Sequence, residues 1–341
     1  MDTTRVVVVG ASAGGVGPLE QLVSGIPSDF AAPVLIVLHT AAGQKPLLPG
    51  ILSSAGPLPA MEAVSGDKLR AGHIYVAPAD CHLLVTPDHI AVTRGPKEND
   101  FRPSIDVLFR SAAYHFGTRA IGIVLSGLLS DGSSGLYAIK RLGGIAVVQD
   151  PAEALYDSMP LSALRRVDID YALPACEIGR LLGGLLEEPL APEPLDAAHY
   201  RAELKHDVDV SGSDPSVAPA VASAREPSMY TCPECGGVLH TIEEGRTQRF
   251  RCHTGHGYTK HALLEDCTRG IESSLWEAVR RLQETTVLLD ETAEQLCARG
   301  DEQAAKTLRY KARQLKARTE TVRSIALERP GLDDDLYPPA P

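Results

Sequence analysis

A serine, a histidine and an aspartate in the first half of the chain have the residue types of a nucleophilic catalytic group. Ser12 lies in the segment GASAG (residues 10–14), which matches the G-x-S-x-G pattern of a nucleophile elbow, where small residues let the chain turn sharply and expose the hydroxyl. His39 and Asp131 each follow an apolar run that indicates a buried strand. An imidazole can accept the proton of a serine hydroxyl, and a carboxylate fixes the tautomer of that imidazole. The three residues therefore predict a serine nucleophile, a general base and an orienting acid.

Each of these residues also has a plainer interpretation. A glycine-rich turn after a first strand is often a phosphate-binding loop or a simple turn, a histidine in a loop is often solvated, and Asp131-Gly132 is an ordinary turn sequence. Their joint placement favours catalysis, because the carboxyl ends of parallel strands meet at one edge of a sheet. We therefore expect Ser12, His39 and Asp131 to share one crevice.

Three of the seven cysteines form a second group together with a histidine. Cys232 and Cys235 stand in C-x-x-C spacing before two glycines, and Cys252 and His256 follow in C-x-x-x-H spacing. Two pairs of this kind suit a tetrahedral zinc ion, and four protein ligands make such a site structural rather than catalytic. His253 is a competing ligand, and three free buried thiols are the alternative without metal. Because a module this small has little core, we expect metal binding to supply its folding energy.

The elements that position Ser12, His39 and Asp131 follow from the alternation of short apolar runs with helical stretches. Continuous apolar strands separated by helices are typical of a parallel sheet that is covered on both faces. We therefore predict an α/β domain with a doubly wound, mostly parallel sheet and a small inserted hairpin at Leu83–Thr93. The predicted strands are Val6–Val9, Pro33–Leu38, His73–Ala77, Ala120–Leu125 and Gly144–Gln149, and the predicted helices are Val16–Ser24, Ile105–Phe116 and Leu136–Arg141.

Charge and composition divide the 341-residue chain into four parts. Residues 187–228 hold nine acidic and three basic residues, so they carry −6 of the formal net charge of −11, with six prolines and no sustained apolar pattern. Such a segment buries too little apolar surface to offset its ordering, so we predict a disordered acidic linker there. The catalytic domain is expected at 1–186, a zinc-binding module at 229–262 and a helical hairpin at 263–329.

The overall composition excludes several classes of protein. With 44% apolar and 23% charged residues the chain is neither collagen-like nor wholly disordered, and no apolar run reaches the roughly 18–20 residues of a membrane helix. The apolar stretch Val6–Val9 is too short for a signal peptide, and seven cysteines without an export signal do not indicate a disulfide framework. An acidic chain lacks the basic footprint of a nucleic-acid binder. We therefore expect a cytoplasmic protein with no nucleic-acid partner and no membrane insertion, and the oligomeric state stays open.

The first half of the chain resembles the CheB-type chemotaxis methylesterases, which are protein-glutamate methylesterases. The resemblance covers roughly residues 4–186 and is carried by separate motifs in the right order: VVVVGASAGG, VLHT, GHIYVAPADCHLL, FRPSIDVLFRSAA, GIVLSGLLSDGSSG, GGIAVVQDP and ALYDSMPLSAL. It implies a doubly wound α/β enzyme that hydrolyses glutamate γ-methyl esters on chemoreceptors and releases methanol. Many members also deamidate specific glutamines. The CPECGG and RCHTGH segments, followed by a helical hairpin, resemble tails found on standalone members of this family.

At the matching positions, the resemblance implies that Ser12 is the nucleophile, His39 the general base and Asp131 the acid that orients it. Backbone N–H groups of Ala13 and Leu128 would form the oxyanion hole. No cofactor is implied for catalysis, and the expected partner is a methylated chemoreceptor or a related signalling protein.

The chain departs from the family pattern at three points. Ala13 stands where a threonine is common, and Leu129 stands in a loop that usually reads G-M-G-N-D-G, so we expect the loop to be reshaped. Many relatives carry an N-terminal phospho-receiver domain, whereas the first predicted strand here begins at Val6. We therefore expect the regulation by such a domain to be absent or supplied in another way.

Two other functions stay open on the residues alone. The segment GASAGGVG also looks like the glycine-rich turn of a short-chain dehydrogenase, but Tyr137 and Lys140 are one residue short of a Tyr-x-x-x-Lys pair, and His39 stands where a ribose-reading residue is expected. Saturable binding of a nicotinamide cofactor would indicate that class. The other function is a non-catalytic signalling adaptor that docks partners through its tail, and such a protein would release no methanol.

Overall fold

The computed structural model describes residues 4–40, 43, 46–212, 226–245 and 247–328, and its centre is a seven-stranded parallel sheet. The strands lie in the order β3-β4-β2-β1-β7-β8-β9. They span Val6–Ala11 (β1), Val34–Leu38 (β2), Ala60–Glu62 (β3), Ile74–Val76 (β4), Ala120–Val124 (β7), Ile145–Gln149 (β8) and Tyr171–Leu173 (β9). Strands β2, β3 and β4 lie on one side of β1, and the chain then crosses to the other side, where β7, β8 and β9 follow in order. This arrangement puts the switch point of the sheet, where ligands bind in such folds, at the carboxyl ends of β1 and β7.

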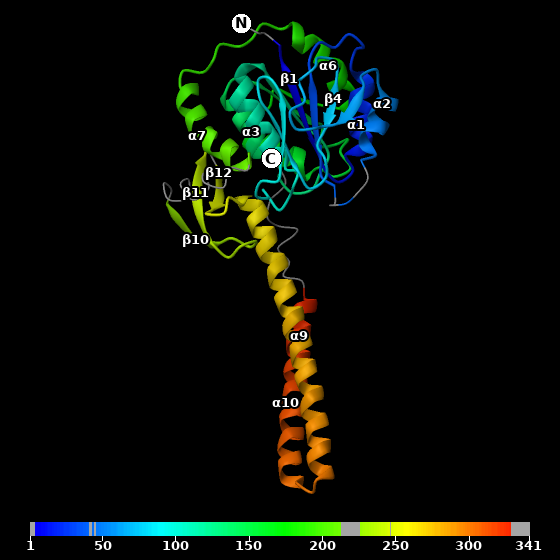
Figure 1. The fold of residues 1–341 in the computed structure, drawn as a ribbon, viewed down its shortest axis with the longest axis vertical. Coiled ribbons are helices and arrows are strands. Elements are labelled where there is room, and N and C mark those ends of the chain that lie inside the picture. The colour runs from blue at the N-terminus through cyan, green and yellow to red at the C-terminus, as the bar shows by residue number, and fades with distance from the viewer. Residues whose placement is uncertain (1–3, 41–42, 44–45, 213–225, 246, 329–341) are drawn as a thin grey trace. The chain divides into compact units, whose positions relative to one another are not determined.

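Helices cover both faces of this sheet because its central strands are apolar on both faces. Val7 and Val9 of β1 pack toward one layer of helices, whereas Val6 and Val8 pack toward the other. The first layer holds α1 (Val16–Gly25), α2 (Leu48–Ala55) and α6 (Ala175–Glu187), and the second holds α3 (Ile105–Phe116), α4 (Ser133–Arg141) and α5 (Ser158–Arg166) (Figure 1). The predicted α/β class with a doubly wound sheet is confirmed.

The predicted inserted hairpin is present, and several short elements are additional to the prediction. The hairpin is formed by β5 (His82–Val85) and β6 (Ile90–Thr93), and it packs against α3. A 3₁₀ turn at Gly117–Arg119 follows α3. The sequence analysis missed α2 because Pro49 and Gly50 stand inside its eight residues, and missed β3 and β9 because each has only three residues.

The prediction of a disordered linker at 187–228 is wrong over part of its length. Helix α7 (Ala197–Ser211) lies there and packs on α3, with Leu204 and Val210 buried. Its Asp207 is also buried and forms an ion pair with Arg249. A search for apolar periodicity misses such a helix because part of its buried face is charged. Residues 213–225 of the predicted linker lie outside the described residues.

A four-stranded antiparallel sheet follows, which we call the tail sheet. It consists of β10 (Pro227–Thr231), β11 (Val238–Glu244), β12 (Thr247–Cys252) and β13 (Gly257–Thr259). Its small core contains Leu239, Phe250 and Tyr258 beside two of the cysteines. The tail sheet belongs to the same compact unit as the catalytic domain, which ends at Leu263, so it is no separately tethered module.

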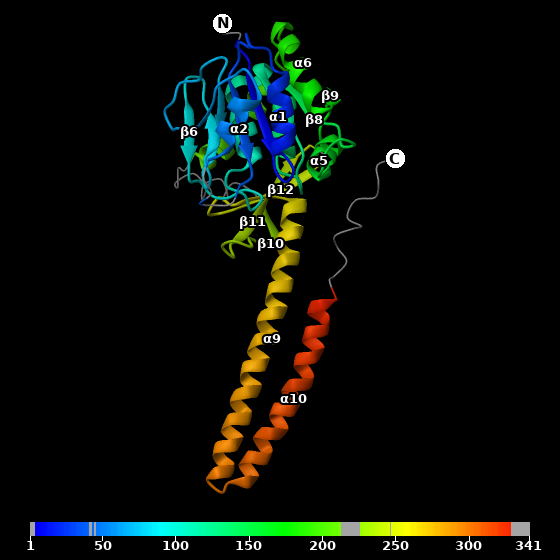
Figure 2. The same cartoon turned by 90° about the vertical axis from the view of Figure 1, so that its right-hand side faces the viewer.

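A second compact unit begins at Leu264 and contains a helical hairpin. Its helices are α9 (Lys260–Ala298), whose first residues belong to the first unit, and α10 (Glu302–Leu327), and Figures 1 and 2 show the two side by side. The Asp301 side chain caps α10 by accepting a hydrogen bond from the Ala304 N–H. The buried residues recur every seven positions, which is the coiled-coil period: Val279, Thr286 and Ala293 in α9, and Ala305, Ala312, Thr319 and Ala326 in α10. Leu288 of α9 lies off this buried row and is 61% exposed. Among the described helices, none combines the length and apolar character needed to cross a membrane.

Candidate active site

The structure brings Ser12, His39 and Asp131 into one hydrogen-bonded row at the carboxyl edge of the sheet. Ser12 follows β1, His39 follows β2, and Asp131 lies in the loop after β7. The His39 Nδ1 atom lies 3.0 Å from Ser12 Oγ, and His39 Nε2 lies 2.8 Å from Asp131 Oδ2. A carboxylate oxygen only accepts, so Nε2 carries the proton and Nδ1 offers its lone pair to the serine hydroxyl. This is the arrangement that a histidine needs to act as a general base.

Burial increases along this row from Ser12 to Asp131. Ser12 is half-buried, the His39 side chain is 6% exposed, and the Asp131 side chain is fully buried. A glycine is needed at position 127 to leave room for the Ser12 side chain. An added Cβ at Gly127 would lie 2.8 Å from the Ser12 Cβ and 2.1 Å from the sulfur of Met159. A reagent can therefore reach the hydroxyl while water is kept from the acid.

Asp131 is held as an anion by five hydrogen bonds. Besides His39, its carboxylate accepts bonds from the side chains of Asn99 (2.9 Å) and Ser104 (2.9 Å) and from the backbone N–H groups of Ile105 (2.7 Å) and Asp106 (3.3 Å). The two N–H groups belong to the first turn of α3, whose free donors and helix dipole favour a negative charge. Burial alone would raise the pKa of Asp131, but His39, Asn99 and Ile105 as donors hold that pKa below its ordinary value. The structure thus favours the charged form that supports a protonated imidazole.

A second carboxyl group, Asp106, lies behind Asp131 and has the opposite tendency. Its Oδ2 accepts a bond from Asn99 Nδ2 (2.9 Å), and its Oδ1 accepts one from the Gly135 N–H (2.7 Å). Burial, and then the negative charge of Asp131, raises the pKa of Asp106 well above its ordinary value. The pair thus separates into one carboxylate and one carboxyl that retains its proton to higher pH.

The sequence analysis did not assign roles to Asn99, Phe101, Ser104 and Asp106. Phe101 stacks on the His39 ring, with ring centroids 3.7 Å apart and planes 10° from parallel. Phe101, Ser104 and Asp106 lie in the motif FRPSID, which carries part of the family resemblance. The motif marks the segment, but its residue types do not indicate which groups contact His39 or Asp131. Ser104 is an example: a serine before a helix is expected to cap that helix, but the Ser104 hydroxyl at the N-cap of α3 donates to Asp131 instead.

The two backbone groups predicted for an oxyanion hole lie beside Ser12. Ala13 is the next residue, and Leu128 follows Gly127, where an added Cβ would lie 2.8 Å from the Ser12 Cβ. Among the residues that the structure describes, neither the Ala13 N–H nor the Leu128 N–H donates to a backbone acceptor. The Ala13 carbonyl is turned away and accepts a bond from Ser126 Oγ (2.9 Å). Both N–H groups are therefore available to a negatively charged oxygen near Ser12.

Leu129, the departure from the family loop, adopts the left-handed backbone conformation with φ +66°. A non-glycine residue pays about 1–2 kcal/mol for this conformation, whereas glycine does not. We expect Leu129→Gly to raise the free energy of unfolding by about 0.5–1 kcal/mol, because relief of strain exceeds the added chain entropy of glycine. Urea unfolding measures this change. Leu128→Gly is the matched control, since Leu128 does not have a positive φ, and an equal gain in both variants would contradict the explanation by strain.

His82 predicts a pH dependence of stability. Its ring is buried, with Nε2 donating to the Pro96 carbonyl (2.9 Å) and Nδ1 accepting from the Ser104 N–H (3.2 Å), and burial lowers the pKa of His82 to about 4. Between pH 6.5 and 4 the unfolded chain therefore binds the extra proton, so His82 makes the fold less stable as the pH falls, by about 3 kcal/mol over this window. The measurement is the free energy of unfolding of the wild type minus that of His82→Gln, at pH 6.5 and pH 4. Asp106, whose raised pKa acts in the opposite direction, is present in both proteins, so its contribution cancels in the subtraction. The prediction is contradicted if the free energy of unfolding differs between the two proteins by the same amount at both pH values.

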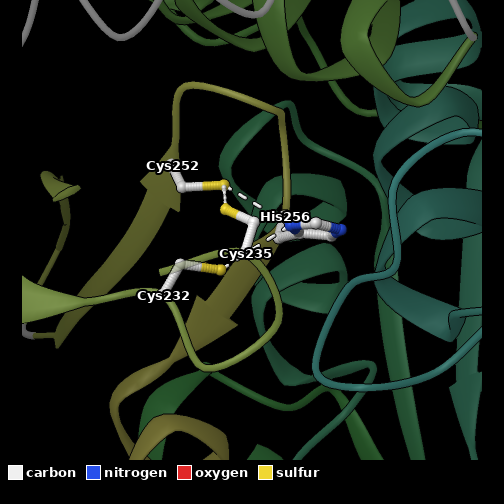
Figure 3. A group of neighbouring side chains, drawn as sticks. All are labelled: Cys232, Cys235, Cys252 and His256. Atoms are coloured by element: carbon white, nitrogen blue, oxygen red, sulfur yellow. Dashed lines mark hydrogen bonds between the residues drawn. The ribbon is translucent and has the colours of Figure 1, made fainter. Parts of the chain in front are cut away.

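The predicted metal ligands converge in the tail sheet. The ligand atoms of Cys232, Cys235, Cys252 and His256 all lie within 4.8 Å of one another (Figure 3). Cys235 Sγ and Cys252 Sγ are 3.6 Å apart, and His256 Nδ1 lies 3.6 Å from Cys232 Sγ and 3.5 Å from Cys252 Sγ. Zinc–sulfur bonds of about 2.3 Å in a tetrahedron would put two sulfurs about 3.8 Å apart, so the spacing fits zinc. His253, the competing ligand, is outside this group and lies against Gly237.

The first half of this chain is similar to several known proteins. The sequence profile of the CheB methylesterase family matches residues 7–182. A putative protein-glutamate methylesterase/protein-glutamine glutaminase of Leptospira interrogans is 38% identical over 176 residues, which cover 51% of this chain and 91% of that protein. Protein-glutamate methylesterase/protein-glutamine glutaminase 2 of Anaeromyxobacter dehalogenans is 40% identical over 178 residues, 52% of each chain, so this chain spans about half the length of that relative.

A solved structure gives the same result for the fold. The catalytic domain of Thermotoga maritima CheB methylesterase is 30% identical, with a TM-score of 0.52, over 53% of this chain and 98% of that chain. The family profile ends before α7 and the tail sheet, so these elements lie outside the matched segment.

Proposed function

Because the chain belongs to the CheB methylesterase family, we propose that it is a serine hydrolase that cleaves glutamate γ-methyl esters on chemoreceptor proteins. The observation that carries this proposal is the row Ser12–His39–Asp131, with hydrogen bonds of 3.0 and 2.8 Å and an anionic acid at its buried end. A glycine-rich turn alone would also suit other functions, whereas a base and an acid bonded in sequence to the Ser12 hydroxyl are the groups that activate a serine nucleophile.

The reaction proceeds in two halves. Ser12 Oγ attacks the ester carbonyl carbon while His39 Nδ1 takes the hydroxyl proton, and Asp131 stabilises the positive imidazole. The N–H groups of Ala13 and Leu128 stabilise the negative carbonyl oxygen. When the tetrahedral intermediate collapses, the C–O bond to the methoxy group breaks, and His39 returns its proton so that methanol leaves.

Water completes the cycle. His39 Nδ1 takes a proton from a water molecule, which attacks the acyl-enzyme carbonyl, and Ser12 leaves as the protonated hydroxyl. The product is the glutamate carboxylate. The same steps with a glutamine side chain release ammonia instead of methanol, and the names of the relatives support this second activity.

Apolar side chains near Ser12 support a protein substrate rather than a small soluble ester. Leu128, Leu155 and Tyr156 are 47%, 74% and 40% exposed, and the last two lie against Gly14. A pocket of about 180 Å³ is lined by Leu38 and Thr40, the chain neighbours of His39, and by residues of the α2 helix. Solvent-exposed apolar groups of this kind suit the surface of a receptor helix. We expect the enzyme to act in the cytoplasm.

We also propose that Cys232, Cys235, Cys252 and His256 hold a structural zinc ion. The support is the spacing of the four ligand atoms and the hydroxyl of Thr254, which lies 3.0 Å from Cys252 Sγ and 3.2 Å from Cys235 Sγ and can donate to thiolates. Zinc would hold the turns of the tail sheet together and supply no step of ester hydrolysis.

The dehydrogenase alternative has little support in the surroundings of Tyr137. Its ring packs on Tyr200 and lies against Gly245 of the tail, so it is not available as the catalytic tyrosine of that class. The adaptor alternative is tested below.

The test of the proposed function combines a natural and a chemical substrate. The purified chain should release methanol from a methylated chemoreceptor, and a fluorophosphonate ester should label it on the peptide that contains Ser12, as located by mass spectrometry. A chain that binds receptor but neither releases methanol nor takes up label would favour the adaptor. Saturable nicotinamide binding would favour the dehydrogenase.

A further inference from the structure

The last strand of the tail sheet pairs with a loop of the catalytic domain, although about 160 residues separate them in sequence. The Asn99 N–H donates to the Gly257 carbonyl (2.8 Å), and the Gly257 N–H donates to the Lys97 carbonyl (3.2 Å). Glu98 and Gly257 form a parallel bridge, so residues 97–99 extend the tail sheet beyond β13. The tail sheet therefore holds this loop by its backbone.

The side chain of Asn99 joins the tail sheet to the acid of the catalytic row. Its Oδ1 accepts a bond from the Thr259 N–H (2.8 Å), which settles the orientation of the amide, because a backbone N–H can only donate. Its Nδ2 then donates one proton to Asp131 Oδ1 and the other to Asp106 Oδ2, both at 2.9 Å. Asn99 is 2% exposed and has φ +54°, and it is the single asparagine of the chain.

We infer that Asn99 is a positioning residue for Asp131, and that the tail sheet completes the catalytic centre by orienting Asn99 through Thr259. The catalytic part of this inference rests on the proposed function. The tail acts on the reaction through this amide and does not touch the substrate.

The chemistry of the position explains why an amide is needed. The Asn99 amide uses both of its N–H protons and its oxygen: the carboxyl groups of Asp131 and Asp106 need donors, whereas the Thr259 N–H needs an acceptor. An aspartate would keep the acceptor and the shape but would put a third carboxyl beside Asp131 and Asp106. An alanine would leave the Thr259 N–H and one lone pair of Asp131 buried without a partner, which is costly.

A buried ion network holds the tail sheet against the catalytic domain, so Thr259 and Asp131, the partners of Asn99, keep fixed positions relative to each other. Arg251 of β12 pairs with Glu98 (3.2 Å), and Glu98 also pairs with Arg110 of α3. Arg249 pairs with Glu244 (3.2 Å), which accepts a bond from Ser134 of α4 (2.9 Å). Breaking such a network by removing one partner leaves a buried charge uncompensated, so the contact between the two parts resists separation.

The loop has a second contact with the catalytic row. Phe101, two residues after Asn99, stacks on His39. Thr259 Oγ1 also shares a hydrogen bond of 2.9 Å with Ser130, the residue before Asp131. A displacement of the tail sheet would therefore change the positions of both His39 and Asp131.

The pH profile distinguishes a positioning role from a purely structural one. The titratable groups that face Asp131 are His39, Asp106 and His82, with Glu98 and Arg110 behind Asp106. The hydrogen bond from Asn99 lowers the pKa of Asp131, so its loss raises that pKa and makes the carboxylate a stronger acceptor toward the His39 ring. The acid limb of the kcat profile should then move to higher pH.

The first experiment compares Asn99→Asp and Asn99→Ala with the full-length wild type. We expect kcat for methanol release to fall by about 10–100-fold in both variants, with KM unchanged and the acid limb moved to higher pH. Asn99→Asp retains the acceptor for Thr259, so a folded Asn99→Asp with full kcat and an unchanged pH profile would overturn the inference. Gln248→Ala, which removes an exposed amide elsewhere in the tail sheet, should change neither quantity.

The second experiment does not depend on activity. Labelling with ¹⁵N-asparagine yields one side-chain amide pair in the NMR spectrum, because Asn99 is the single asparagine. We expect two separate signals that shift in Asp131→Asn and in Gly257→Ala, where the new Cβ would lie 2.9 Å from the Glu98 carboxyl. Gly270→Ala, with no atom within 4 Å of its Cβ, should leave them unchanged. Signals at the chemical shifts of an unfolded asparagine amide, or signals that do not move in Gly257→Ala, would overturn the inference, whereas a wild type that neither releases methanol nor takes up label would overturn the proposed function alone.

Discussion

Ser12→Ala is expected to lower methanol release from a methylated chemoreceptor by at least about 10⁴-fold, because the variant lacks the hydroxyl that lies 3.0 Å from His39 Nδ1 and would form the acyl-enzyme. The Ser12 side chain is small and half-buried, so the free energy of unfolding should change little. Measurement of methanol release and of fluorophosphonate labelling checks both consequences, and labelling should disappear completely.

Ser24→Ala is the matched control for this result. Ser24 lies in α1, twelve residues after Ser12, and its hydroxyl donates to the Gln21 carbonyl in an exposed position. Its methanol release should equal that of the wild type. Labelling that persists in Ser12→Ala, at a rate near that of the wild type, would contradict the assignment of the nucleophile.

Cys252→Ser is expected to have the largest effect on the stability of the tail sheet. Cys252 ends β12, and its Sγ is close to both Cys235 Sγ and His256 Nδ1, so its loss removes one of four ligands. Structural zinc supplies about 10–16 kcal/mol in isolated small zinc modules, and the core around Leu239, Phe250 and Tyr258 is small. We expect the variant to lose about one zinc ion per chain and to unfold its tail sheet at a lower temperature than the wild type.

The measurements are zinc content by mass spectrometry and thermal unfolding followed by circular dichroism. Cys267→Ser and Cys297→Ser are matched controls, because both thiols are exposed and lie outside the ligand group. They should retain the metal and the unfolding temperature. A wild type that holds no zinc after purification in zinc-containing buffer would contradict the proposal, and full activity of zinc-free Cys252→Ser would argue against the coupling through Asn99.

Much of the catalytic domain was predictable because its determinants are local. Apolar runs such as Val34–Leu38 and Ala120–Val124 form the strands where the sequence places them, and α3 has the predicted bounds Ile105–Phe116. The grouping of Cys232, Cys235, Cys252 and His256 was equally predictable, because C-x-x-C and C-x-x-x-H are spacings within short turns. Helix α7 was not accessible, since its buried Asp207 is stabilised by arginines that lie about 40 residues further on.

The sequence by itself determined the types of the reacting groups and the edge of the sheet where they stand. Ser12, His39 and Asp131 could be named because each follows a strand, and parallel strands end at a common edge. Only the tertiary structure decided what surrounds Asp131: the first turn of α3, Asn99, and through Asn99 the Thr259 N–H of the tail. These contacts join residues that are 26 to 160 positions apart, so no local pattern encodes them, and the contact with Thr259 also requires the tail sheet to pack onto the catalytic domain, where Arg251 pairs with Glu98.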